Sequence, residues 1–105
     1  MSKELKQVQV IAPSANTLTL AYTVPLAGMS LANILITNQD MADARFSVVI
    51  VNTGKSISLA SSQLLPGRTS FETSKFSLES EDEIHVKSTN GTTHFLITSM
   101  DQSEI

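Results

Sequence analysis

The stretch that decides the fold is residues 84–97, which read IHVKSTNGTTHFLI. Apolar and polar residues alternate on both sides of Asn90-Gly91, a dipeptide typical of a two-residue type I′ turn between antiparallel strands. A hairpin with this turn brings the large apolar residues of both strands to one face, with the exception of Leu96. Its opposed pairs are Val86 with Phe95 and Ile84 with Ile97. Because a slip of one residue would destroy this segregation, the stretch predicts a hairpin of defined register.

Short strand candidates continue upstream of this hairpin, with turn residues between them. They span residues 7–11, 17–24, 30–38, 46–51, 56–60 and 71–78. Asn52-Thr53-Gly54 indicates a hairpin turn. Residues 65–68 fit a turn in which Gly67 takes a positive φ. The pattern predicts an all-β fold, an antiparallel β-sandwich of seven or eight short strands with jelly-roll or immunoglobulin-like topology.

The apolar positions of these strands predict the core. The expected members are Leu18, Leu20, Tyr22, Ile34, Ile36, Phe46, Val48, Ile50, Leu59, Phe76, Leu78, Ile84, Val86, Phe95 and Ile97. The polar ends lie outside the strand pattern. We therefore expect an N-terminal arm over residues 1–6, a sandwich domain over residues 7–100 and a C-terminal tail over residues 101–105.

Composition narrows the function classes. The chain has 105 residues, no Cys and a net charge of −3, which fits one domain without disulfides or thiolate metal sites. The mild acidity argues against nucleic acid as a partner. We find neither a signal peptide nor a membrane span, so we expect no membrane partner. We expect a reducing, soluble compartment or a particle assembled there.

Only 16% of residues are charged, whereas fifteen Ser and eleven Thr are present. Such a surface is either wetted by hydroxyl groups or hidden against other proteins.

Two sequence features could indicate chemistry, and each has a plainer interpretation. Residues 52–56, NTGKS, echo a phosphate-binding loop, but Val49 stands where the motif needs its first Gly, and a strand pattern follows. His85 and His94 share the outward face of the predicted hairpin, where no third ligand for zinc and no carboxylate joins them. Lys87 lies opposite His94 in that register and would repel a cation. We interpret both histidines as surface or interface residues.

No constellation of catalytic residues is apparent. The run Glu79, Glu81, Asp82 and Glu83 lacks the offsets of a calcium loop and fits a solvated turn. The Ser residues do not occur in a nucleophile elbow. Aromatic residues make up only 5% of the chain, which disfavours a glycan cleft. We expect no enzymatic activity, no catalytic or metal-binding residues and no cofactor.

The order of strands and turns over residues 22–105 resembles that of small virion proteins of tailed bacteriophages. The segments that carry the resemblance are Val24-Pro25, Ile36-Thr37-Asn38, residues 46–51, the LPGRT turn of residues 65–69, residues 82–88 and residues 94–104. Glu81-Asp82 stands where a Gly-Asp pair is typical, so the match is weaker at that turn. The family includes head-decoration, neck, tail and baseplate components, and the resemblance does not choose among them.

The resemblance implies a non-enzymatic structural protein, made in the cytoplasm of a bacterial host and placed in the virion. It would be a repeated subunit that decorates or stabilises the capsid or the neck and tail, with other virion proteins and further copies of itself as partners. The alternative is a receptor- or glycan-binding module of a fibre or baseplate. The expected interface residues are Leu5, Asn38, Asp40, Met41, Arg45, His85, His94, Met100 and Ile105.

Overall fold

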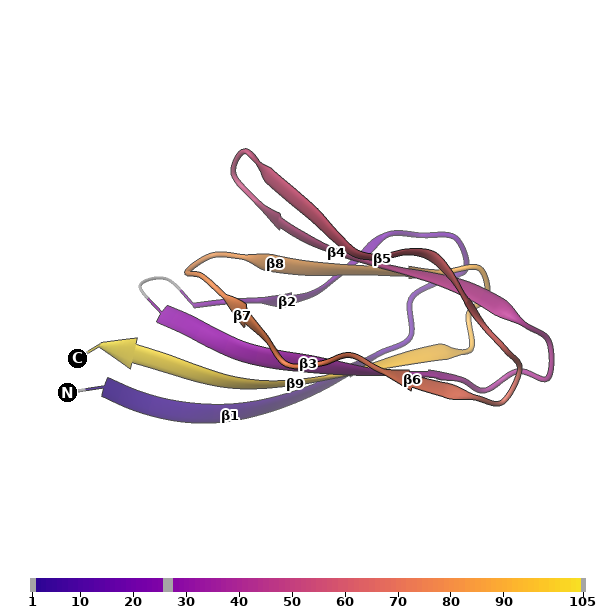
Figure 1. Ribbon diagram of the computed structural model, residues 1–105, viewed down its shortest axis with the longest axis horizontal. Coiled ribbons are helices and arrows are strands. Elements are labelled where there is room, and N and C mark those ends of the chain that lie inside the picture. The colour runs from indigo at the N-terminus through magenta and orange to yellow at the C-terminus, as the bar shows by residue number, and fades with distance from the viewer. Residues whose placement is uncertain (1, 26–27, 105) are drawn as a thin grey trace.

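The computed structural model describes residues 2–25 and 28–104, and the side chains of residues 8–25 and 28–101. This part of the chain forms two antiparallel sheets that pack face to face, which confirms the predicted all-β sandwich (Figure 1). Its nine strands are β1 (Ser2–Ile11), β2 (Thr19–Thr23), β3 (Gly28–Asn38), β4 (Ala44–Asn52), β5 (Lys55–Leu65), β6 (Ser70–Glu72), β7 (Phe76–Leu78), β8 (Glu83–Ser88) and β9 (Thr93–Glu104).

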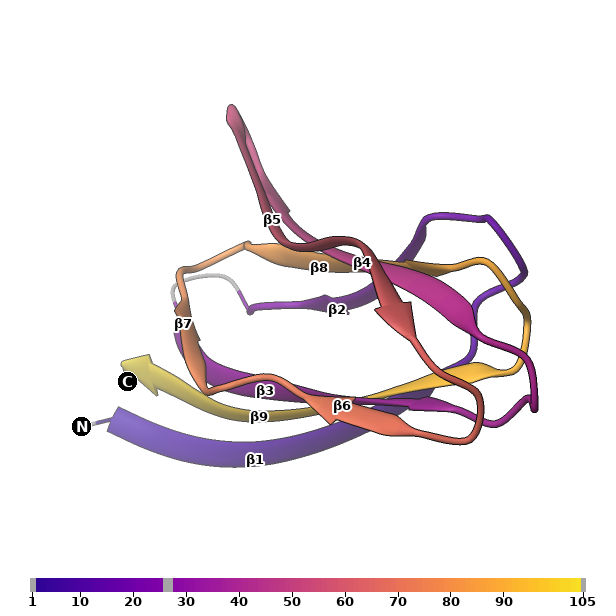
Figure 2. The same cartoon turned by 45° about the vertical axis from the view of Figure 1, so that its right-hand side comes forward.

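One sheet, which we call sheet A, has the order β1-β9-β3, and the short strands β6 and β7 pair successively with the far edge of β3. The other, sheet B, has the order β2-β8-β4-β5. The β4–β5 hairpin extends beyond the body of the sandwich, and its tip rises away from sheet A (Figure 2). Its turn confirms the predicted hairpin, since Asn52 pairs with Lys55 and Gly54 has a φ of 73°.

The predicted pairing of the last two strands is wrong, although their buried face is right. β8 belongs to sheet B and β9 to sheet A, so residues 89–92 cross from one sheet to the other. Neither Asn90 nor Gly91 has the positive φ of a type I′ turn. Four of the five large apolar residues of the stretch are nonetheless buried, because the two strands face each other across the core. They are Ile84, Val86, Phe95 and Ile97.

The core lies between the sheets and includes most of the predicted residues. Phe46 of sheet B and Phe95 of sheet A meet at its centre, with ring centroids 6.4 Å apart. Leu18, Leu20 and Leu59 were expected in the core but are exposed. For Leu20 the reason is a bulge, since the register of β2 against β8 shifts between Leu20 and Tyr22 and only the later part of the alternation points inward. A similar shift in the pairing of β4 with β5 leaves Leu59 without an opposite residue.

The expected arm and tail belong to sheet A. β1 begins at Ser2 and pairs with β9 in an unbroken register that ends with Ser2 opposite Glu104. The two ends of the chain therefore lie side by side at one end of the sandwich (Figure 1). The boundaries expected after residues 6 and 100 both fall inside strands, because the ladder continues where apolar alternation has stopped.

The turn after β5 uses Gly67 differently from the prediction. Thr69 N donates to Pro66 O at 3.3 Å, and the residue with positive φ is Arg68, at 56°. Gly67 is required by space rather than by φ. A Cβ atom there would lie 2.0 Å from the carbonyl oxygen of Met41, in the loop that follows β3. The Gly67 backbone therefore packs directly on the backbone of that loop.

We expect Gly67→Ala to lower the free energy of unfolding by about 2 kcal/mol, because a backbone segment must shift to admit the methyl group. Urea denaturation followed by circular dichroism measures the change. Gly91→Ala is the matched control, since its Cβ would meet nothing closer than 3.9 Å. Equal stability of the two variants would contradict the close approach of the two loops.

Candidate functional site

The outer face of sheet A carries a band of exposed apolar side chains. Five of them, with exposed fractions between 37% and 63%, come from the adjacent strands β1, β9 and β3. They are Val8, Val10, Met29, Leu31 and Met100, and we call this set the apolar face. Successive side chains of a strand point to opposite faces of the sheet. Because the neighbouring residues in these strands point toward the core side, the five members of the apolar face point outward. Apolar contact with another protein would remove this surface from water.

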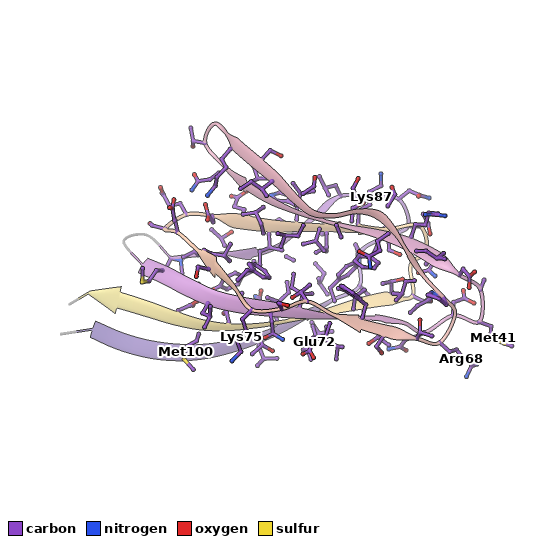
Figure 3. All side chains as sticks on the ribbon, viewed as in Figure 1. Met41, Arg68, Glu72, Lys75, Lys87 and Met100 are labelled. Atoms are coloured by element: carbon purple, nitrogen blue, oxygen red, sulfur yellow. The ribbon has the colours of Figure 1, made fainter. Side chains whose placement is uncertain are left out.

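The apolar face is hollowed beside β7. A depression of about 300 Å³ is lined by Leu31, Met100, Asn33, Thr98, Ser99 and Lys75. Figure 3 shows Met100, Lys75 and Glu72 near one another on this side of the molecule. Asn33 Nδ2 donates to Glu72 Oε2 at 2.9 Å. The margin of the apolar face thus carries a cation and an anion, whereas its five members have no charged group.

A second apolar surface lies along the open side of the sandwich, between β5 and the β6–β7 segment. A groove of about 290 Å³ is lined mainly by apolar and hydroxyl-bearing side chains. Its lining residues are Val48, Leu59, Ala60, Gln63, Phe71, Thr73, Ser74, Lys75 and Phe76. The groove explains why Leu59 and Phe71 remain partly exposed in a strand-rich region. Lys75 is its single charged lining residue among those described.

Asn38 is a structural residue rather than an exposed contact, which corrects its predicted interface role. It is fully buried at the end of β3, where its Nδ2 donates to Ala42 O at 2.9 Å and to Leu65 O at 3.1 Å. Its Oδ1 accepts from Asp40 N at 3.0 Å and from Asn90 Nδ2 at 3.3 Å. One side chain thus ties together the three loops at this end of the sandwich.

The neighbouring predicted residues Asp40, Met41 and Arg45 are exposed. Figure 3 shows Met41 and Arg68 projecting from this end of the molecule. Asp40 accepts a hydrogen bond from Arg68 N through its backbone carbonyl, so the loop has a defined shape. Arg45 Nη1 donates to Ser62 O at 2.9 Å, close to the point where the register of β4 against β5 shifts. These three residues are exposed at the loop end of the sandwich, whereas Met100 belongs to the apolar face of sheet A.

His85 and His94 do not form a pair. His85 lies in β8 on the outside of sheet B, and His94 lies in β9 on the outside of sheet A, because the hairpin expected to join them does not form. His85 Nε2 is 3.0 Å from Glu83 Oε1, so a carboxylate does stand beside this histidine, contrary to the prediction. The described residues contain no group of three or more potential metal ligands. The structure does not describe the side chains of the other two predicted residues, Leu5 and Ile105.

Asp82, expected in a solvated turn, is buried and forms a hub between β8 and the β4–β5 hairpin. Its carboxylate accepts from Asn52 Nδ2 at 2.7 Å and from Glu79 N at 2.9 Å, and it lies 3.0 Å from Lys55 Nζ. Burial alone would raise the pKa of Asp82. The hydrogen bonds from Glu79 N–H, Asn52 and Lys55 outweigh burial, and together they hold the pKa of Asp82 below its usual value. Lys55, the lysine of the NTGKS motif, forms an ion pair with the Asp82 carboxylate.

A third buried polar cluster lies between the sheets near the two chain ends. Asp101 of β9 accepts hydrogen bonds from the hydroxyl groups of Tyr22 and Ser30, the latter at 2.7 Å. Burial, and then the hydrogen bond to Asp101, raise the pKa of Tyr22 above its ordinary value, so Tyr22 stays a neutral donor. The cluster joins β2, β3 and β9 across the interior. Asp101 therefore belongs to the packed interior of the domain, although it was expected in the tail.

Comparisons of the chain with family models, with curated proteins and with solved structures give no match. Within the described residues there is no helix long and apolar enough to cross a membrane. The surface of the described residues carries the apolar face, the groove beside β5 and the loop end around Asn38. The apolar face is the one that spans several strands of a single regular sheet.

Proposed function

We propose that this chain is a non-enzymatic structural subunit of a tailed-phage virion, which associates with further copies of itself and with other virion proteins. The phage setting is taken from the resemblance of residues 22–105 to small virion proteins. The observation that supports association is the apolar face, with five exposed large side chains on three adjacent strands. Contiguous exposed apolar surface is a mark of protein interaction sites.

Low charge supports the same proposal. Only 16% of the residues are charged, and depletion of charged residues is the compositional mark of an interface core. The Ser and Thr residues keep the subunit soluble before it assembles. Each contact in the assembly can be weak, because many copies fixed on one particle give a high effective concentration and hence high avidity.

The first test has two measurements. Analytical ultracentrifugation of the purified protein is expected to show self-association that rises with concentration. Mass spectrometry of purified virions of the phage that encodes the chain is expected to find it as a stoichiometric component. A protein that stays monomeric and is missing from the virions would overturn the proposal.

We expect Leu31→Glu to weaken association at least tenfold, because it places a charge within the apolar face, opposite Met100. Ile57→Glu is the matched control, since Ile57 is similarly exposed on β5, away from that face. Circular dichroism melts show whether both variants keep the wild-type fold. Equal loss of association in both variants would mean that the apolar face is not the contact surface.

A further inference from the structure

The edge strands of the two sheets differ in how well they are protected against pairing with another chain. β6 and β7 have three residues each, and β2 has five with a bulge, so each presents only a short ladder. β5 is long, but its register against β4 shifts twice, and Ser62 within it has a φ of 48°. Arg45 also donates to the Ser62 carbonyl of that strand. Short strands, bulges and covering charges are the devices that prevent a sheet edge from pairing with another chain.

β1 is long and has no bulge in its pairing with β9, and its charged residues lie only in its first half. It pairs with β9 over ten consecutive residues without a shift, and its other side has no partner strand among the described residues. A regular edge of this length presents a row of free backbone donors and acceptors, which is a template for a further strand. β1 is therefore the edge of this sandwich best formed to accept another strand.

The second half of β1 is also suited to pairing by its residues. Residues 7–11 read QVQVI, with no charge and no proline, whereas Lys3, Glu4 and Lys6 are confined to the first half. Val8 and Val10 are exposed on the outer side of the sheet. β-Branched residues at exposed strand positions favour cross-strand contacts. They also continue the apolar face to the very edge of sheet A.

We infer that β1 pairs antiparallel with β1 of a second copy of this chain, around a two-fold axis at Gln9, so that sheet A continues from one subunit into the next. This inference rests on the proposed function and names the partner and the strand. In this register Val8 lies opposite Val10 of the second copy. The uncharged segment 7–11 of one copy lies opposite the same segment of the other. A register centred on Lys6 would oppose two lysines, which is unfavourable.

Cysteine crosslinking tests the register directly, because the natural chain has no Cys. In the inferred pair, Gln9 lies opposite Gln9 of the second copy, at a Cα separation of about 5 Å, within the range of a disulfide. Gln9→Cys is expected to form a disulfide dimer under mild oxidation, at least ten times faster than Ser58→Cys at the same concentration. Ser58 is the control because it is exposed on β5, the other long edge.

Charge substitution provides an independent test without oxidation. Gln9→Lys and Gln9→Glu are each expected to weaken self-association at least tenfold, since each places like charges opposite one another. An equimolar mixture of the two variants is expected to recover association, because unlike charges then meet. Ser58→Lys is expected to leave association unchanged.

The outcomes separate this inference from the proposed function. If the wild-type protein associates but Gln9→Cys stays uncrosslinked, or if Ser58→Cys crosslinks instead, the β1 pairing is wrong and the structural role stands. If Gln9→Cys crosslinks and the mixed variants recover association but the chain is missing from virions, the pairing stands and the virion role is wrong. Failure of the charge-reversal mixture to associate would also overturn the pairing.

Discussion

We expect Asn38→Asp to lower the free energy of unfolding by about 4 kcal/mol, a large fraction of the stability of a small domain. Asn38 is fully buried, and its Nδ2 faces the carbonyl oxygens of Ala42 and Leu65. An aspartate has no donor for these oxygens when ionised, and it would hold a charge in a site that excludes water. The size of Asp matches that of Asn, so the loss comes from chemistry rather than from a cavity.

Urea denaturation at pH 7 measures this loss, and Asn16→Asp is the matched control. Asn16 is exposed and has a φ of 59°, which aspartate also tolerates, so we expect a change within about 0.5 kcal/mol. If Asn38→Asp does not fold, Asn38→Ala introduces no charge and is expected to cost about 3 kcal/mol. A loss below 1 kcal/mol in Asn38→Ala would show that the three loops do not depend on this side chain.

The fold class was predictable because alternation is a local property of each strand. Alternation identifies the residues of β8 and β9 that face the core, and these residues are buried. It does not identify the sheet that each strand joins. A hairpin and a crossing between two sheets both bring Ile84, Val86, Phe95 and Ile97 to the interior, and the dipeptide Asn90-Gly91 favoured the hairpin. The local turn preference was outweighed by packing of the two sheets.

The buried polar hubs were missed, although the sequence contains a signal for them. Asn38 is in phase with Ile34 and Ile36 along β3, and Asp101 is in phase with Phe95 and Ile97 along β9. A polar residue in phase with buried positions must find hydrogen-bond partners inside the protein. Those partners come from distant loops and strands, and for this reason the sequence pattern alone could not identify them.

The predicted interface residues show the same limit. Exposure of Met41 and Met100 agrees with their expected position on the surface, whereas burial of Asn38 removes it from the set. The apolar face was not predicted, because its members come from three strands whose neighbours in the sheet are unknown until the order β1-β9-β3 is seen. Val8 and Leu31 are 23 positions apart in the sequence, and they become parts of one surface because β1 and β3 both pair with β9.

We expect Asp82→Ala to lower the free energy of unfolding by about 3 kcal/mol at pH 7. The substitution leaves the Asn52 amide and the Glu79 N–H without their buried acceptor, and it removes the nearer of the two carboxylates that face the partly buried Lys55. Glu79→Ala is the matched control. The Glu79 carboxylate is mostly exposed and lies 3.9 Å from Lys55, so its removal is expected to cost less than about 1 kcal/mol.

The same hub predicts a dependence of stability on acid. The folded protein holds the pKa of Asp82 below its value in the unfolded chain, so the unfolded chain binds a proton first as the pH falls. The stabilisation from Asp82 is complete above a pH of about 4, the ordinary pKa of an aspartate, and is lost as the pH falls toward the lower pKa of the folded state. Thermal melts between pH 7 and pH 2 measure this loss. Asp82→Asn lacks the titrating group, so the stability difference between wild type and Asp82→Asn is expected to narrow below pH 4. A difference that stays constant over that range would show that the carboxylate is not held ionised by Asn52, Lys55 and the Glu79 N–H.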